Sequence, residues 1–154
     1  MACAGDMKWS IQAELESFYF SNMSPQRPGF NRGIWKVLEG VVRGFAYSEG
    51  SVFVITGPVL SDSRIAAPDT PGGRKRIPIP EWFYKVVYDE TEPKKMIGFL
   101  IPHKEGLQGV RNYACTVADV EKRTGLSFFS SIKPEELGDM KKSFDIKQWS
   151  WMVK

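Results

Sequence analysis

The side chains that most often carry out chemistry are few in this sequence. Its 154 residues include one histidine, His103, and two cysteines, Cys3 and Cys115, which lie far apart. Structural zinc sites use four Cys or His ligands, and small disulfide-stapled proteins use several cysteine pairs. The sequence therefore disfavours a zinc site, a disulfide scaffold and every site that depends on two histidines. The two cysteines are predicted to be unpaired thiols.

Two other groups of polar residues are candidates for binding or structural roles. Arg74, Lys75 and Arg76 form a basic run inside residues 61–80, a long segment rich in proline and glycine. Such a run can contact phosphate groups, although a basic loop is more often simply solvated, and both interpretations stay open. Asn31 stands directly before an apolar periodic stretch, where asparagine is a favourable helix N-cap.

The overall composition is that of an ordinary globular domain. Hydrophobic residues make up 42% and charged residues 25% of the chain, and its length suits one domain over residues 1–154. A net charge of +3 permits a polyanionic partner without requiring one. The longest apolar runs, such as residues 97–101, fall far short of the ~20 residues that cross a bilayer. No membrane partner is therefore expected.

The elements that must position these side chains begin with an amphipathic helix. Arg32, Lys36 and Arg43 fall on its polar face, and Gly50 follows its end. The apolar residues recur with the spacing of one helical face; they are Ile34, Trp35, Leu38, Val41, Val42 and Phe45. We expect this stripe to pack on the core of the domain.

Short apolar or aromatic runs predict strands around this helix. Thr116 and Asp119 have the pattern of a capping box, which predicts a helix that stops at Gly125, and residues 134–142 suggest another helix. The predicted strands are residues 18–22, 51–56, 82–88, 96–101 and 111–116, of which the second is expected to be buried. Strands and helices mix without βαβ regularity, so the sequence predicts an α+β fold.

Four segments taken together carry a more specific signal. They are residues 18–26 (FYFSNMSPQ) with 30–39 (FNRGIWKVLE), residues 54–58 (VITGP), residues 79–87 (IPEWFYKVV) with 99–102 (FLIP), and residues 116–129 (TVADVEKRTGLSFF). Their order and spacing resemble the DNA/RNA non-specific endonuclease family, the endonuclease G-like ββα-metal finger nucleases. The resemblance covers residues of about 5–130. It implies a central antiparallel sheet flanked by helices.

The resemblance also implies an activity and assigns site residues. Members of this family hydrolyse phosphodiester bonds of DNA and RNA with Mg²⁺, for which Mn²⁺ is an alternative. Whether the chain forms a homodimer is left open. Asn31 matches the asparagine that ligates the metal, and Asn22 matches one that shapes the site and binds substrate. Glu39 matches a glutamate that acts on metal-bound water. Because eight residues of helix rise about 12 Å, Glu39 is expected to act indirectly. Arg74, Lys75 and Arg76 are then candidate contacts to the nucleic acid.

The sequence departs from the family pattern at the catalytic base. The family uses the histidine of an Asp-Arg-Gly-His motif, and that motif does not occur in these residues. By its spacing to the following segment, this histidine should lie directly before Met1, so the N-terminal part of the fold is expected to be missing. His103 lies away from the matched finger and is not expected to replace it. The chain is therefore predicted to be weakly active or inactive; the alternative is a non-catalytic remnant that binds nucleic acid weakly.

Overall fold

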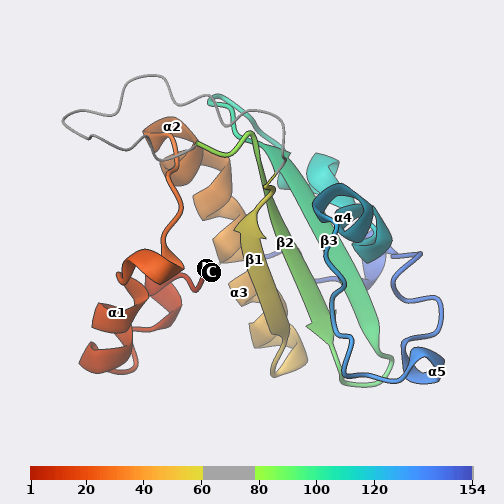
Figure 1. Cartoon of the computed structure of the whole chain (residues 1–154). Helices are drawn as coiled ribbons and strands as arrows, with labels where there is room; N and C mark the ends of the chain where they lie inside the picture. The colour runs from red at the N-terminus through yellow and green to blue at the C-terminus, as the bar shows by residue number, and fades with distance from the viewer. Residues whose placement is uncertain (61–78, 154) are drawn as a thin grey trace.

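An antiparallel β-sheet forms the centre of the computed structural model, which describes residues 1–60 and 79–153. Within those residues the sheet has four strands in the order β1-β2-β3-β4. The strands are β1 (Phe53–Pro58), β2 (Trp82–Asp89), β3 (Lys95–Pro102) and β4 (Ala114–Cys115). The long helix α3 (Lys36–Glu49) covers one face, and α4 (Val117–Thr124) covers the other (Figure 1). The predicted α+β class is confirmed.

The two faces of the sheet are both buried, which explains why β2 and β3 are mostly apolar. Successive side chains of a strand point to opposite faces. In β2, Phe83 and Val87 pack in the cluster under α3, whereas Tyr84 and Val86 belong to the cluster under α4. Lys85 is two residues away from both Phe83 and Val87 along β2. Its side chain therefore points to the same face of the sheet as theirs, the face covered by α3.

The predicted amphipathic helix is confirmed, but it begins differently. A single turn, α2 (Pro28–Phe30), leads into an irregular turn, η3 (Asn31–Trp35), and then into α3. Asn31 has helical dihedral angles, so the prediction that it is an N-cap is wrong. Proline is favourable in a first helical turn and starts the helix three residues earlier. Gly33 then interrupts the regular geometry with φ −93° and ψ −118°. At the other end Gly50, at φ 85°, stops α3.

Two strand predictions are wrong in ways that have physical reasons. Residues 18–22 follow α1 (Ile11–Ser17) and form a 3₁₀ turn, η2 (Phe20–Asn22), rather than a strand. The Ser10 hydroxyl caps α1 by accepting from the Ala13 amide, and no strand of the described residues pairs with the aromatic run. β1 is a strand, as expected, but it lies at the sheet edge, and 51% of Phe53 is exposed. Residues 111–116 form mostly the 3₁₀ turn η4 (Val110–Tyr113) and only a two-residue strand.

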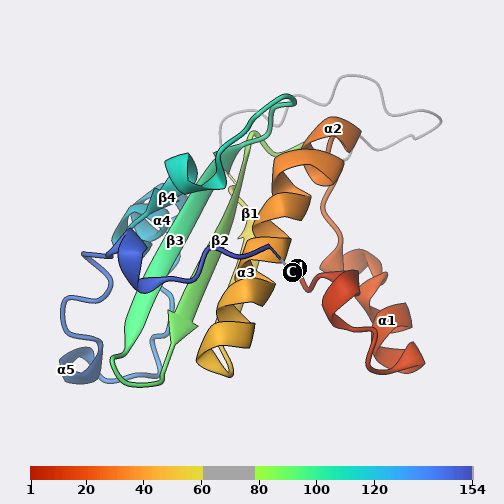
Figure 2. The same cartoon turned by 180° about the vertical axis from the view of Figure 1, so that it is seen from behind.

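The C-terminal third supports the sheet from both sides. The capping box at Thr116 and Asp119 is confirmed, and Gly125 ends α4 in the left-handed region. The helix expected over 134–142 is shorter, because α5 (Pro134–Leu137) stops at Gly138, whose φ is positive. The chain then crosses to the other face (Figure 2), where Trp149 packs on Phe45 with ring centroids 4.7 Å apart. Among the described residues, no helix is long and apolar enough to cross a membrane.

The capping box allows a test of how α4 is held. Thr116→Ala removes the hydroxyl that accepts from the Asp119 amide at 3.0 Å, and it should lower the free energy of unfolding by about 1 kcal/mol. Thr116→Ser keeps this oxygen and should lose much less. Denaturant unfolding of the two variants measures the difference. Equal losses would show that the methyl group, not the cap, is what matters.

Candidate active site

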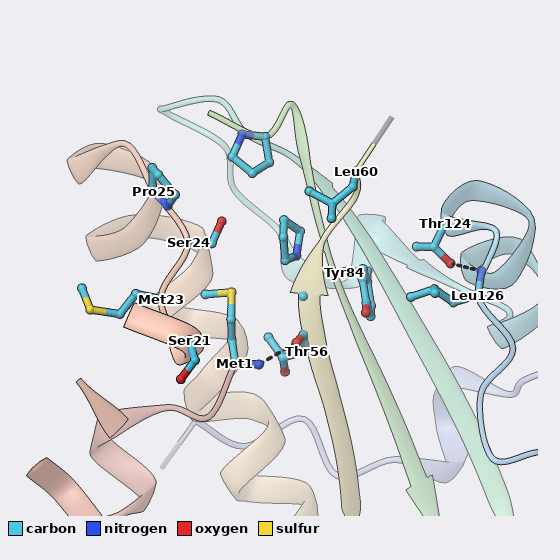
Figure 3. A pocket seen from close by; sticks show the side chains of 13 residues that line it. Met1, Ser21, Met23, Ser24, Pro25, Thr56, Leu60, Tyr84, Thr124 and Leu126 are labelled. Atoms are coloured by element: carbon cyan, nitrogen blue, oxygen red, sulfur yellow. Dashed lines mark hydrogen bonds between the residues drawn. The ribbon is translucent and has the colours of Figure 1, made fainter. Parts of the chain in front are cut away.

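Two of the predicted site residues, Asn22 and Glu39, lie where α3 meets the edge of the sheet and the first residues of the chain. The Met1 amine donates a hydrogen bond to the Thr56 carbonyl on β1 at 2.9 Å (Figure 3). Residues 1–6, which include the short turn η1 (Ala4–Asp6), therefore run between β1, α3 and η2. We call residues 1–6 the N-terminal segment.

Asn22 holds this segment in place. Its amide oxygen accepts from the Ala2 backbone at 2.6 Å, and its amide nitrogen donates to the Ala2 carbonyl at 2.9 Å and to the Ser17 carbonyl at 2.8 Å. Both ends of the side chain are thus committed to backbone groups. The structure consequently gives Asn22 a clamping role, in which it joins η2 to the N-terminal segment.

A second set of contacts ties the segment to α3. The Arg43 guanidinium donates to the Asp6 carboxylate at 2.5 Å and to the Cys3 sulfur at 3.4 Å. Glu39 lies one turn before Arg43 on α3 and is half-buried. Burial raises the pKa of the Cys3 thiol, and the nearby Glu39 and Asp6 carboxylates raise it further. Glu39 therefore faces Cys3 rather than open solvent.

Lys85 completes the group, and sequence reasoning missed it. Only 4% of this lysine is exposed; its ammonium donates to the Thr56 hydroxyl at 2.8 Å and lies 5.1 Å from the Trp35 ring centre. Burial lowers the pKa of Lys85, and Glu39 is the strongest charge that acts in the opposite direction. A lysine inside an otherwise apolar strand was the signal in the sequence, because buried lysines need a partner.

Asn31 lies in the turn η3, which also carries Trp35, the residue whose ring faces the Lys85 ammonium. Its neighbours on either side, Phe30 and Trp35, are buried and stack with ring centroids 5.5 Å apart, whereas Asn31 itself is exposed. Its side-chain amide makes no hydrogen bond with any residue that the structure describes, so the side-chain oxygen is available. One amide oxygen suits a hydrated divalent cation such as Mg²⁺, which keeps several waters. Within residues 1–60 and 79–153, no cluster of three or more His, Cys, Asp or Glu could hold a metal.

The structure thus brings some of the predicted residues together and not others. Asn22 and Glu39 both contact the N-terminal segment, one at Ala2 and the other at Cys3. Asn31 belongs to the same helical run as Glu39, but in the described part of the chain no hydrogen bond joins it to Glu39 or Asn22. The predicted contacts Arg74, Lys75 and Arg76 lie outside the described residues.

Beside the N-terminal segment there is an open cavity of about 470 Å³. Figure 3 shows that it lies between the 21–25 stretch and the end of β1, with Tyr84 and Leu126 on its far side. Its described walls are mainly apolar and hydroxyl-bearing. Two titratable groups of those residues line it: the Met1 amine, whose pKa burial lowers, and the Tyr84 hydroxyl, whose pKa burial raises.

His103 packs on Phe30, the residue before Asn31, with ring centroids 4.8 Å apart, and Cys115 lies on β4, at the opposite edge of the sheet from β1. The Nε2 atom of His103 accepts from the Arg27 amide at 2.6 Å, and its Nδ1 atom lies 2.8 Å from the Pro80 carbonyl. The imidazole must therefore be neutral with its proton on Nδ1, and both nitrogens serve the fold. Cys3 and Cys115 are unpaired, as predicted, and burial raises the pKa of Cys115 to about 12.

Comparison with known sequences gives one family. The sequence model described as DNA/RNA non-specific endonuclease matches residues 1–135. The mitochondrial nuclease EXOG of Danio rerio is 31% identical over 151 residues, which cover 91% of this chain and 44% of that protein. Nuclease C1 of Cunninghamella echinulata is 34% identical over 150 residues, which cover 91% of this chain and 59% of that protein. The chain thus spans about half the length of the curated relatives it matches.

Comparison with solved structures gives the same fold. This chain superposes on the crystal structure of the EndoG/EndoGI complex, a structure solved to explain EndoG inhibition, with a TM-score of 0.71 and 30% sequence identity. The match covers 88% of this chain and 59% of that one. The sheet and its flanking helices are therefore shared with a nuclease structure.

The burial of Lys85 predicts an unusual dependence of stability on pH. Since folding lowers the pKa of Lys85 below 10.5, the unfolded chain binds more protons there, and stability rises as pH rises toward that value. Lys85→Met should abolish this rise, because methionine fills the space without a charge. Lys36→Met, on the exposed side of α3, is the control and should keep it. Denaturant unfolding between neutral and alkaline pH measures the effect; identical profiles for all three proteins would contradict it.

His103 predicts a dependence of the same sign at lower pH. Burial lowers the pKa of His103 below 6.5, so protonation favours the unfolded chain, and stability should fall as pH falls below that value. His103→Gln, which does not titrate, should remove this loss. It should also cost about 1–3 kcal/mol at neutral pH, because one of the two buried hydrogen bonds of the ring is left unsatisfied. Thermal melts across this pH range are the measurement. Unchanged stability in the variant would show that the ring is not structural.

Proposed function

The chain belongs to the DNA/RNA non-specific endonuclease family, and we propose that its site hydrolyses phosphodiester bonds of DNA and RNA with a divalent cation, Mg²⁺ or Mn²⁺. The observation that carries this proposal is the state of Asn31. Its amide is exposed and uncommitted, while buried aromatic rings anchor the turn on both sides of it. A side chain held by its neighbours and left without a partner is suited to bind a ligand.

The described residues support a distinct role for each member of the site. Asn31 would hold the cation through its amide oxygen, and the cation, when bound, would stabilise charge on the scissile phosphate. Glu39 is placed to accept hydrogen bonds from water near the N-terminal segment, and its carboxylate acts on the buried Lys85 ammonium. Asn22 holds the segment against η2 through Ala2. Arg74, Lys75 and Arg76 are proposed to contact phosphates of the substrate.

Residues 1–154 offer no free imidazole to act as a general base. His103 is the one histidine of the chain, and both of its nitrogens are committed. Loss of a general base typically reduces a rate by 10²–10⁴-fold. We therefore propose that this polypeptide by itself cleaves slowly or not at all. The same observation favours a second candidate function, which is weak nucleic-acid binding without catalysis.

Chemical rescue separates the two candidates. With Mg²⁺, residues 1–154 should nick plasmid DNA slowly, and added imidazole should accelerate nicking by supplying the base in solution. If imidazole has no effect at any concentration, the non-catalytic candidate holds. Robust nicking without imidazole that is abolished by His103→Gln would contradict the assignment of His103 to the fold.

Asn31 variants test the metal site in the same assay. Asn31→Ala should lose at least about tenfold of the rescued rate, which is about 1.4 kcal/mol in the barrier, because the protein oxygen ligand is gone. Asn31→Asp should bind Mg²⁺ at least as well as the parent, since it adds negative charge for a hard cation. Calorimetric titration with Mg²⁺ gives a readout that does not depend on cleavage. Asn112→Ala, in the exposed turn η4, is the control and should change neither quantity.

A further inference from the structure

The helical run that carries Asn31 is strongly positive at its start. Residues 23–38 contain three cations, Arg27, Arg32 and Lys36, and no carboxylate. Glu105 approaches the first of these from the β3 side, where its carboxylate accepts from the Gly29 amide at 3.2 Å. Arg32 and Lys36 follow in η3 and at the start of α3, and neither forms an ion pair with a residue that the structure describes.

The positions of Arg32 and Lys36 relate them to the candidate site. Lys36, Glu39 and Arg43 are spaced by three and four residues in α3 and so share one face of the helix. Arg32 precedes Lys36 by four residues, next to Asn31. At one end of this row Arg43 is bonded to Asp6 and Cys3. At the other end Arg32 and Lys36 are exposed, and neither makes an ion pair or hydrogen bond with a residue that the structure describes.

Several other cations of the described chain have partners, although Lys133 and Lys147 are exposed and unpaired as Arg32 and Lys36 are. Lys95 is paired with Asp89 and Glu49, Lys141 is paired with Glu121, and Arg111 and Arg123 lie over tryptophan rings. What sets Arg32 and Lys36 apart is their place in the chain. Arg32 directly follows Asn31, whose exposed side-chain amide makes no hydrogen bond with a described residue, and Lys36 begins α3. Neither cation makes a visible contact that stabilises the fold.

We propose that Arg32 and Lys36 form a phosphate-binding pair that holds the sugar-phosphate backbone of the nucleic acid next to Asn31. This inference rests on the proposed function. A guanidinium can bind two phosphate oxygens side by side, and an ammonium adds a compact charge. Contacts to phosphates carry no sequence information, which suits binding to both DNA and RNA.

Binding in the absence of metal tests the pair without relying on cleavage. Fluorescence anisotropy with a labelled DNA duplex, in EDTA and across a range of salt concentrations, compares the chain with its Arg32→Gln/Lys36→Gln variant. Loss of two phosphate contacts should weaken binding roughly tenfold at low salt and reduce the slope of log K against log salt by about two. The melting temperature should stay the same or rise.

Two further variants make the result specific. Lys133→Gln/Lys147→Gln removes the same charge from exposed, unpaired positions elsewhere in the described chain and should leave the slope unchanged. Arg32→Lys/Lys36→Arg keeps both charges and should retain most of the affinity. If the Arg32→Gln/Lys36→Gln variant binds DNA as well as the Lys133→Gln/Lys147→Gln variant does, the inference is overturned. Binding by the parent chain would still support the proposed function. If the parent chain does not bind DNA even at low salt, the proposed function fails first.

Discussion

An aromatic cluster around Phe30 is the interaction on which the site depends. The Phe30 ring lies 5.5 Å from Trp35, 5.5 Å from Phe83 and 4.8 Å from His103, in stacked, tilted and edge-on arrangements. Such pairs contribute energy beyond their buried area and favour particular geometries. Because Phe30, Ile34 and Trp35 are all held inside, Asn31 and Arg32 are left on the outer side of the turn. The exposure of Asn31 is therefore a consequence of core packing.

The same cluster explains why the helix is irregular where it carries Asn31. A regular helix would place Phe30 and Trp35 on different sides, since five residues advance it by well over one turn. The wide turn over η3, with Gly33 in a conformation outside the helical region, brings both rings to the sheet. Wide turns of this kind occur often at functional sites. Here the irregularity has a local cause in the two rings.

Much of this architecture could be predicted from periodicity, and the failures have specific causes. The apolar stripe from Ile34 to Phe45 and the apolar runs of β2 and β3 are long, and burial on a sheet leaves them few alternatives. Residues 18–22 were predicted as a strand from aromatic content alone. That prediction failed because a strand also needs a partner, and Ser10 provides a cap for a helix just before it.

The site was less predictable than the fold, because its contacts join residues distant in the sequence. Resemblance to a family pointed to Asn22, Asn31 and Glu39, but it gave no indication that Asn22 clamps Ala2. Lys85 appeared only as one polar residue in an apolar strand. Its links to Thr56 and Trp35 come from the strand register and from the packing of η3, and neither can be read from local sequence.

The raised pKa values of both thiols have a practical consequence for handling the protein. A thiolate, not a thiol, reacts with oxidants and alkylating reagents, so a cysteine that stays protonated at neutral pH is slow to be modified. At about 12, the pKa of Cys115 keeps that thiol almost wholly protonated, and Cys3 is shifted in the same direction by its buried, acidic surroundings. Maleimide labelling of a cysteine introduced on the exposed surface should therefore be selective without removal of either native residue.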